Sequence, residues 1–276
     1  VLVGGGHTHA MVLRMLATKP ISGVRLNLVS VGDHTPYSGM LPGLIAGHYQ
    51  FDQTHIDLRR YCARLGVRFI KASACGIDLQ GQQLELENHP PLSFDALSID
   101  IGSQPSYSDI KGAEDLVVPV KPVAGFYDRW LAVEQRVRAA ENETPFKVAI
   151  VGGGAGSVEL AMAMRHRLPG LTVKISLICG NELLREYSQH TRDIVRTSCA
   201  QLGIEIMENQ WVAEVERSEI RTRNGEKFSC DEIFWCTQAE GAPWLAQSGL
   251  DCDPAGFLQV RDTLQLLKHD NLFAAG

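Results

Sequence analysis

The chain contains two glycine-rich turns of the same kind, and each lies between an apolar β-branched run and a helical pattern. They are Val3-Gly4-Gly5-Gly6-His7-Thr8-His9-Ala10 and Val151-Gly152-Gly153-Gly154-Ala155-Gly156-Ser157-Val158-Glu159. The first glycine of such a turn allows a tight bend, and the next but one lets the backbone approach a pyrophosphate at the helix N-terminus. The succession of strand, turn and helix therefore predicts two dinucleotide sites.

Both turns lack the third glycine of the fingerprint, which is replaced by His9 in the first and by Ser157 in the second. We therefore expect helix and strand to pack slightly farther apart at both places. His7 and His9 are two residues apart at a helix start, so they cannot share one helix face. We expect them to flank the pyrophosphate or to pack in the core, and we predict no metal site.

The residues after the two turns repeat one order of predicted elements. The first half has a helix at 8–18, a strand at 24–30, a helix at 54–65, a strand at 67–71, a hairpin at 80–81 and a strand at 95–101. The second half has a helix at 155–167, a strand at 173–179, a helix at 189–202, a strand at 204–207, a hairpin at 224–225 and a strand at 231–236. This order predicts an α/β chain with two Rossmann-like three-layer ββα dinucleotide-binding domains.

The second of these domains is predicted to be inserted in the first. The first domain comprises residues 1–115 plus 246–276, and the inserted domain comprises residues 116–245. The chain is expected to cross between them in the linker 105–119 and at the turn 241–243, where proline and glycine are concentrated.

About a dozen extra residues lie between Ser30 and Gly66 in the first half only, and they include the segment 34–43 with two prolines and two glycines. This composition predicts a shaped loop and not a strand. Ligands of open α/β sheets lie beyond the carboxyl ends of the strands, so the loop is expected to cover the first ligand. An ordinary surface connection is the alternative.

Composition limits the classes of partner. The chain has 276 residues, of which 45% are hydrophobic and 21% charged, and its net charge of −6 includes no basic run, so nucleic acid is not expected as a partner. No stretch approaches the roughly 20 apolar residues of a membrane span. No signal peptide is visible, and the seven cysteines are odd in number and widely spaced, so we expect a cytoplasmic protein.

The paired turns and three further segments resemble the two-dinucleotide-binding flavoproteins, which include type II NADH dehydrogenases and pyridine nucleotide-disulfide oxidoreductases. These segments are Asp100-Ile101-Gly102-Ser103, Cys236-Thr237-Gln238 and Asn271-Leu272-Phe273-Ala274-Ala275-Gly276. The resemblance covers essentially the whole chain. The first turn, the segment 37–43 and the step Val120-Lys121-Pro122 resemble most the flavoprotein module fused to selenide, water dikinase.

The resemblance implies FAD at the first site and NAD(P)H at the second. For the flavin it implies contacts from Gly4, Gly6, His7, Thr8, His9, Ser30, Tyr37, Ser38, Gly39, Met40, Leu41, Pro42, Gly102, Ser103 and Gly276. For the pyridine nucleotide it implies contacts from Gly152, Gly154, Ala155, Gly156, Ser157, Glu159 and Cys179. The family continues after the position of Gly276 with an aspartate that holds the flavin's ribityl chain, so a longer polypeptide, with a kinase beyond, is expected.

The chain departs from the family pattern at three points. Ser30 and Cys179 occupy the positions where an acid usually binds the ribose hydroxyls. Cys179 is the weaker partner, so the choice between NADH and NADPH stays open. The chain also lacks a Cys-x-x-Cys or Cys-x-x-x-x-Cys pair, which disfavours reduction of disulfides through a flavin-linked dithiol.

Two residues are candidates for catalysis. Glu159 matches a family position where a glutamate approaches the junction of flavin and nicotinamide, and Lys121 is its candidate partner; the alternatives are an ordinary surface glutamate and a solvated lysine. Cys236 and Cys199 are expected to be buried small hydrophobic residues. The alternative for them is a low-pKa thiol that attacks a sulfur or selenium substrate.

The sequence therefore predicts an FAD-dependent NAD(P)H oxidoreductase. A hydride from the pyridine nucleotide would pass to flavin N5, and the electrons would then reach a small-molecule acceptor. A selenium or sulfur species, in support of selenophosphate synthesis, and a quinone are the two acceptor classes considered. A non-catalytic module that senses flavin or nucleotide and regulates a fused kinase is the alternative from a different functional class.

Overall fold

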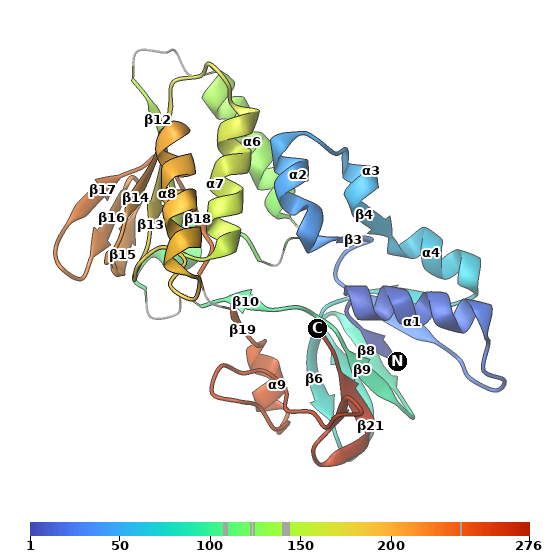
Figure 1. Cartoon of the computed structure of the whole chain (residues 1–276). Helices are drawn as coiled ribbons and strands as arrows, with labels where there is room; N and C mark the ends of the chain where they lie inside the picture. The colour runs from blue at the N-terminus through green and yellow to red at the C-terminus, as the bar shows by residue number, and fades with distance from the viewer. Residues whose placement is uncertain (107–109, 122, 124, 140–143, 238) are drawn as a thin grey trace. The chain divides into compact units, whose positions relative to one another are not determined.

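The computed structural model describes residues 1–106, 110–121, 123, 125–139, 144–237 and 239–276, which form two units (Figure 1). The first unit contains Val1–Tyr37, His55–Gln104 and Ala239–Gly276, and the second contains Ser38–Thr54 and Pro105–Gln238. Pro122 and Gln238, which belong to the family resemblance, lie outside the described residues. The same is true of residues 107–109 in the predicted linker.

A six-stranded sheet forms the centre of the first unit, in the order β20-β21-β9-β1-β2-β5. Its strands are β1 (Leu2–Val3), β2 (Asn27–Ser30), β5 (Arg68–Lys71), β9 (Leu97–Ile99), β20 (Gln265–Leu266) and β21 (His269–Ala274). All neighbours run parallel except β20, which is antiparallel to β21. The two central strands β1 and β2 are completely buried, because the sheet is covered on both faces there.

Helices cover one face of this sheet and a small second sheet covers the other (Figure 1). Leu13 of α1 (His7–Thr18) and Leu58 of α4 (Leu58–Leu65) pack with Leu2 and Leu28 of the sheet. On the other face, Val3 and Val29 pack with the antiparallel strands β6 (Ala74–Asp78), β7 (Gln83–Leu86) and β8 (His89–Ser93) and with α9 (Pro243–Gln247).

The second unit repeats this plan around a parallel sheet in the order β11-β18-β12-β13-β14. The strands are β11 (Val118–Pro119), β12 (Phe146–Val151), β13 (Val173–Ile178), β14 (Ile204–Met207) and β18 (Glu232–Trp235). The helices α6 (Phe126–Ala139), α7 (Ala155–Arg167) and α8 (Gln189–Gln201) pack on one face. The strands β15 (Val212–Glu216), β16 (Glu219–Thr222) and β17 (Lys227–Ser229) and helix α5 (Ala113–Leu116) pack on the other.

The predicted fold class is therefore confirmed, with three layers in each unit. Local signals set several element ends. The Asp57 carboxylate accepts a hydrogen bond from the Arg60 amide at the start of α4, and the Ser188 hydroxyl accepts one from the Thr191 amide at the start of α8. Gly66 adopts a left-handed conformation with φ of +66° after α4, which ends that helix as the sequence predicts.

The segment between β2 and α4 differs from the predicted loop. It contains β3 (His34–Pro36), a 3-10 turn η1 (Ser38–Met40), α2 (Leu41–Ala46), α3 (Phe51–Thr54) and β4 (His55–Asp57). The prediction of a shaped loop without a strand was wrong, because His34–Pro36 pairs antiparallel with His55–Asp57. The predicted helix at 54–65 is shorter at its start for the same reason.

Helix α2 belongs to the core of the second unit. Leu41, Leu44 and Ile45 are buried there with side chains of α6 and α7, and Pro42 lies in the first turn of α2, where its missing N–H has no partner to lose. The apolar residues of this segment have helical spacing, which explains why it packs as a buried helix. The sequence analysis missed this spacing because proline and glycine are concentrated in the segment.

The units are connected at the start of the predicted linker 105–119 and directly before the predicted turn 241–243. The chain crosses at β10 (Gln104–Pro105) and at β19 (Ala239–Glu240), so both crossings precede the predicted boundaries at 115 and 245. The physical reason is that Val118 pairs with Phe234 of β18 and that Lys111 forms an ion pair with Glu214. These contacts attach the segment 110–119 to the second unit.

Candidate dinucleotide sites

The first glycine turn packs tightly against the carboxyl end of β9. Gly4 has φ of +93°, and its amide donates to the Val29 carbonyl at 2.8 Å. A Cβ atom at Gly4 would overlap with the Asp100 carbonyl oxygen, and the Gly6 amide donates to that same oxygen at 3.3 Å. The turn therefore requires glycine at position 4 both for its conformation and for the close approach to Asp100.

The helices that follow both turns begin without a side-chain cap. The N-cap of α1 is Gly6 and that of α7 is Gly154, and neither can supply a side-chain oxygen to the first amides of its helix. These amides, together with the positive end of the helix dipole, are suited to a phosphate. Both sites thus fit the pyrophosphate of a dinucleotide.

Asp100 places a buried carboxylate beside the first turn. Asp100 is only 5% exposed, and one of its carboxylate oxygens accepts a hydrogen bond from the His9 amide at 3.2 Å. A Cβ atom at Gly6 would overlap with this carboxylate, and one at Gly276 would lie 2.9 Å from it. The structure therefore brings Gly6, Asp100 and Gly276 together at one point of the first unit.

His9 is completely buried and connects the helix to the sheet. Its Nδ1 lies 2.7 Å from the Gly4 carbonyl oxygen and its Nε2 lies 2.9 Å from Ser98 Oγ. Since a carbonyl can only accept, Nδ1 is the donor. Burial lowers the pKa of His9, so the ring is neutral and Nε2 accepts from the Ser98 hydroxyl. His9 therefore serves as a packing group, with both ring nitrogens used within the protein.

His9→Gln should make the stability of the protein less dependent on pH. Because the pKa of His9 is lower in the folded state, the unfolded chain binds a proton first as the pH falls through about 6.5, which destabilises the fold by up to about 2 kcal/mol near pH 5. Urea unfolding at several pH values measures this slope. His89→Gln, at an exposed histidine, is the control, and equal slopes in both variants would contradict the assignment.

The other predicted contacts of the first site occupy the same edge of the sheet or the segment that follows β2. Ser30 is buried at the end of β2, and its Oγ faces Gly5. The ring of His7 meets the ring of Tyr37 edge-on, with 4.6 Å between centroids. Thr8 and Ser103 are partly exposed, and Gly102 has φ of +74° with open space beside it.

The second glycine turn repeats the geometry of the first with one important difference. A Cβ atom at Gly152 would overlap with the Cys236 carbonyl oxygen, and the Ser157 hydroxyl donates to that oxygen at 3.4 Å. Cys236 therefore takes the place that Asp100 has in the first half. A Cβ atom at Gly154, by contrast, would meet nothing within 4 Å. The space beside Gly154 is open for a ligand.

Cys179 lies at the end of β13 and is completely buried. Its thiol donates to the Gly152 carbonyl at 3.6 Å, and burial raises its pKa to about 12. It can support the turn but cannot act as an anionic partner of a ribose.

The charges of Glu159 and Lys121 both act on Cys236. Burial raises the pKa of Cys236; Ser157 and Lys121 lower it, and Glu159 raises it further. Glu159 and Lys121 are exposed, and no ion pair joins these two described residues. Burial also raises the pKa of Cys199. Both raised pKa values favour the expected role of Cys236 and Cys199 as buried small residues over the alternative of a low-pKa thiol.

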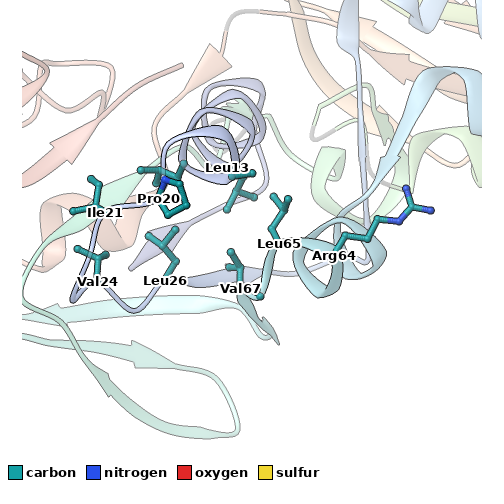
Figure 2. A pocket seen from close by; sticks show the side chains of 11 residues that line it. Leu13, Pro20, Ile21, Val24, Leu26, Arg64, Leu65 and Val67 are labelled. Atoms are coloured by element: carbon teal, nitrogen blue, oxygen red, sulfur yellow. The ribbon is translucent and has the colours of Figure 1, made fainter.

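An apolar pocket of about 250 Å³ lies at the opposite end of α1 from the glycine turn (Figure 2). Leu13, Leu26, Leu65 and Val67 line it, and the guanidinium of Arg64 points away from it in Figure 2. Because the pocket lies at the far end of α1, it is not part of the dinucleotide site. Within the described residues no group of three metal-ligating side chains occurs, and no helix is long and apolar enough to cross a membrane.

Several functional candidates escaped the sequence analysis. Asp33 lies three residues after Ser30, and Glu182 lies three residues after Cys179. Both form ion pairs, Asp33 with Arg59 and Lys71 and Glu182 with Arg192. This equal spacing in the two halves could have identified both acids from the sequence alone. Asp100 was visible only as part of the family resemblance, because its burial depends on the fold.

Comparisons with known proteins agree with this geometry. The family model "Pyridine nucleotide-disulphide oxidoreductase" matches residues 1–276. "NADH dehydrogenase-like protein YutJ" of Bacillus subtilis is 23% identical over 100% of this chain and 75% of that protein. "Demethylphylloquinone reductase NdbB" of Synechocystis is 24% identical over 99% of this chain and 69% of that protein. The sulfide:quinone oxidoreductase structure from Aquifex aeolicus superposes with a TM-score of 0.79 and 18% identity, over 100% of this chain and 67% of that one.

These matches confirm the predicted oxidoreductase family and its NADH dehydrogenase-like branch. FAD with NAD(P)H, the predicted cofactor pair, is the pair that this family uses. The two glycine turns, each followed by a helix in a three-layer unit, agree with this match. The chain belongs to the pyridine nucleotide-disulphide oxidoreductase family.

Proposed function

We propose that this chain is an FAD-dependent NAD(P)H oxidoreductase that holds FAD at the first glycine turn and the pyridine nucleotide at the second. The observation that supports this most is the pair of helices whose N-cap residue is a glycine, Gly6 and Gly154, each beside the carboxyl end of a parallel strand. When bound, FAD would supply the chemistry of accepting a hydride from the nucleotide and passing electrons to a second acceptor.

The first unit would bind the flavin dinucleotide mainly through its backbone. The first amides of α1 would hold the pyrophosphate, and the glycine at position 4 allows the bend that directs them. Tyr37 and the residues Ser38 to Pro42 are proposed to border the flavin, which is supported by the contact of Tyr37 with His7. Leu41 would act indirectly, because its side chain is buried in the core of the second unit.

The second unit would bind the pyridine nucleotide and orient its reacting end. Gly152 and Gly154 would accommodate the pyrophosphate. Glu159 and Lys121 are proposed to lie near the nicotinamide, since both charges reach Cys236 at the carboxyl end of β18. Held there, they would position the nucleotide.

A quinone is the proposed acceptor. Two of the similar proteins are named for quinone reduction, and the sequence has no Cys-x-x-Cys or Cys-x-x-x-x-Cys pair that could relay electrons from the flavin. An oxidised selenium or sulfur species, delivered for selenophosphate synthesis by a fused kinase, is the alternative acceptor. The third possibility is a non-catalytic module that senses flavin or nucleotide and regulates a fused kinase.

Steady-state assays under anaerobic conditions distinguish these possibilities. The protein is expected to purify yellow and to oxidise NADH or NADPH when a short-chain water-soluble quinone is supplied. Selenite in place of the quinone tests the alternative acceptor. Oxidation with selenite alone would overturn the quinone assignment, and bound flavin without any nucleotide oxidation would favour the sensor.

Asp100→Asn should strengthen flavin binding. The asparagine side chain can still accept from the His9 amide, but it removes a negative charge close to the proposed pyrophosphate. At an effective dielectric constant of about 20, such a repulsion is worth on the order of 1–3 kcal/mol, or about 5- to 150-fold in affinity. Titration of the apoprotein with FAD measures the dissociation constant, and weaker binding in this variant would contradict the proposed position of the pyrophosphate.

A further inference from the structure

At the carboxyl edge of the second unit's sheet, the aromatic ring of Trp211 and the guanidinium of Arg223 form a corner. No ligand has so far been assigned to it. Trp211 follows β14, and its indole ring faces Gly180, the residue after Cys179. A Cβ atom at Gly180 would lie 3.1 Å from this ring. The glycine therefore permits the ring to pack on the backbone at the end of β13.

This corner is continuous with the second glycine turn. The Cys179 thiol contacts the Gly152 carbonyl at 3.6 Å, and a Cβ atom at Gly153 would lie 3.2 Å from Cys179. The Gln210 amide in turn donates to the Cys179 carbonyl at 2.8 Å. The turn, the end of β13 and Trp211 are thus joined by direct contacts, and the adenosine half of a dinucleotide lies over this side of such a sheet.

Arg223 adds a positive charge to the same corner. Its guanidinium lies 5.4 Å from the centroid of the Trp211 ring, and its amide donates to the Trp211 carbonyl at 2.8 Å. Stacking on an aromatic face orients a guanidinium while its N–H groups stay available. Arg223 is exposed and forms no ion pair with any residue that the structure describes.

The carboxylates of the neighbouring segments are already neutralised. Glu182 pairs with Arg192, and Glu208 accepts from the Leu183 amide and from Arg196, both at 2.7 Å. At the end of β13 the residue is Cys179, which burial keeps neutral, so no carboxylate there repels an anion. Arg223 is therefore a cation of this corner that has no ion pair with any residue the structure describes.

We propose that Trp211 and Arg223 bind the 2′-phosphate end of NADPH, so that the second site prefers NADPH to NADH. This inference rests on the proposed function, because it assumes that the second turn binds a pyridine nucleotide. The ring of Trp211 would lie against the adenosine, and Arg223 would donate charge-assisted hydrogen bonds to the 2′-phosphate. The buried Gln210 Oε1, which has no donor among the described residues, would gain one from the adenosine.

Calorimetric titration with the adenosine fragments tests binding without any redox chemistry. Adenosine 2′,5′-bisphosphate should bind about tenfold more tightly than 5′-AMP, the value expected for hydrogen bonds from one exposed charged group. Arg223→Ala should remove this difference and leave 5′-AMP binding unchanged, and Arg223→Lys should retain part of it. Trp211→Ala should weaken the binding of both fragments.

Arg217→Ala is the matched control. Arg217 is exposed at the closed end of the β15–β16 hairpin, whereas Trp211 and Arg223 flank its open end. Arg217→Ala therefore removes one positive charge from the protein, as Arg223→Ala does, but away from the corner. A tenfold preference that persists in Arg223→Ala, or that is lost equally in Arg217→Ala, would overturn the inference. Equal binding of both fragments by the unmodified protein would overturn it too.

Reduction of the bound flavin separates failure of this inference from failure of the proposed function. A protein that NADH reduces as efficiently as NADPH keeps the proposed function and loses only the inference. A protein that neither nucleotide reduces, and that binds neither adenosine fragment, loses both.

Discussion

Gly154→Val is expected to slow reduction of the flavin by pyridine nucleotide by about 100-fold or more while the protein stays folded and yellow. A side chain at this position meets no protein atom within 4 Å, and the backbone there is extended with φ of −88°, which valine tolerates. The change of N-cap residue costs about 1 kcal/mol at most. The loss would therefore arise because the side chain occupies the space of the pyrophosphate.

A graded series sharpens this test. Gly154→Ala should cause a smaller loss than Gly154→Val, since its single methyl group fills less of the open space. Flavin content and melting temperature serve as controls, and both should stay close to those of the unmodified protein. Loss of flavin together with reduction would show that the two sites have been assigned to the wrong halves.

Gly6→Val is expected to abolish flavin binding, and the structure gives a reason that differs from that for Gly154. A Cβ atom at position 6 would overlap with the Asp100 carboxylate, so the substitution should also destabilise the fold by about 1–3 kcal/mol, as overpacking does. Flavin content after purification and urea unfolding measure the two effects separately.

The double variant Gly6→Val with Asp100→Ala separates the two effects. Removing the carboxylate makes room inside the protein, so the double variant should regain most of the stability. It should still fail to bind flavin, because valine remains at the proposed pyrophosphate position. A double variant that is both stable and yellow would contradict the placement of the flavin at the first turn.

The sequence predicted those elements whose ends have local signals. Helix α7 has the predicted bounds, and α8 and the strands after it differ by one residue or two, because caps and glycine turns act within a few residues. The internal repeat added further constraint, since each half supported the elements assigned to the other.

What the sequence did not predict depends on contacts between distant segments. Helix α6 was missed, although Phe126, Trp130, Val133 and Val137 follow helical spacing and fill the core of the second unit. The side of the molecule on which α2 packs could not be inferred, because nothing local distinguishes the core of one unit from that of the other.

In the candidate sites, too, local features were predicted and contacts between distant segments were not. The glycines and the ends of the helices were predicted, since a pyrophosphate needs them at fixed spacing. The hydrogen bonds of His9 to Gly4 and Ser98, the carboxylate of Asp100 and the corner at Trp211 each join residues from separate strands. Only the sheet order brings these residues together.

Anaerobic stopped-flow mixing with NADH and with NADPH tests the central proposal, electron transfer between two dinucleotides, most directly. The yellow protein should lose its flavin absorbance near 450 nm, a wavelength typical of oxidised flavins in general, within seconds of mixing with one nucleotide or both. Gly154→Val should keep that absorbance under the same conditions. Flavin that stays oxidised in the unmodified protein with both nucleotides would contradict the proposal and leave a binding module in its place.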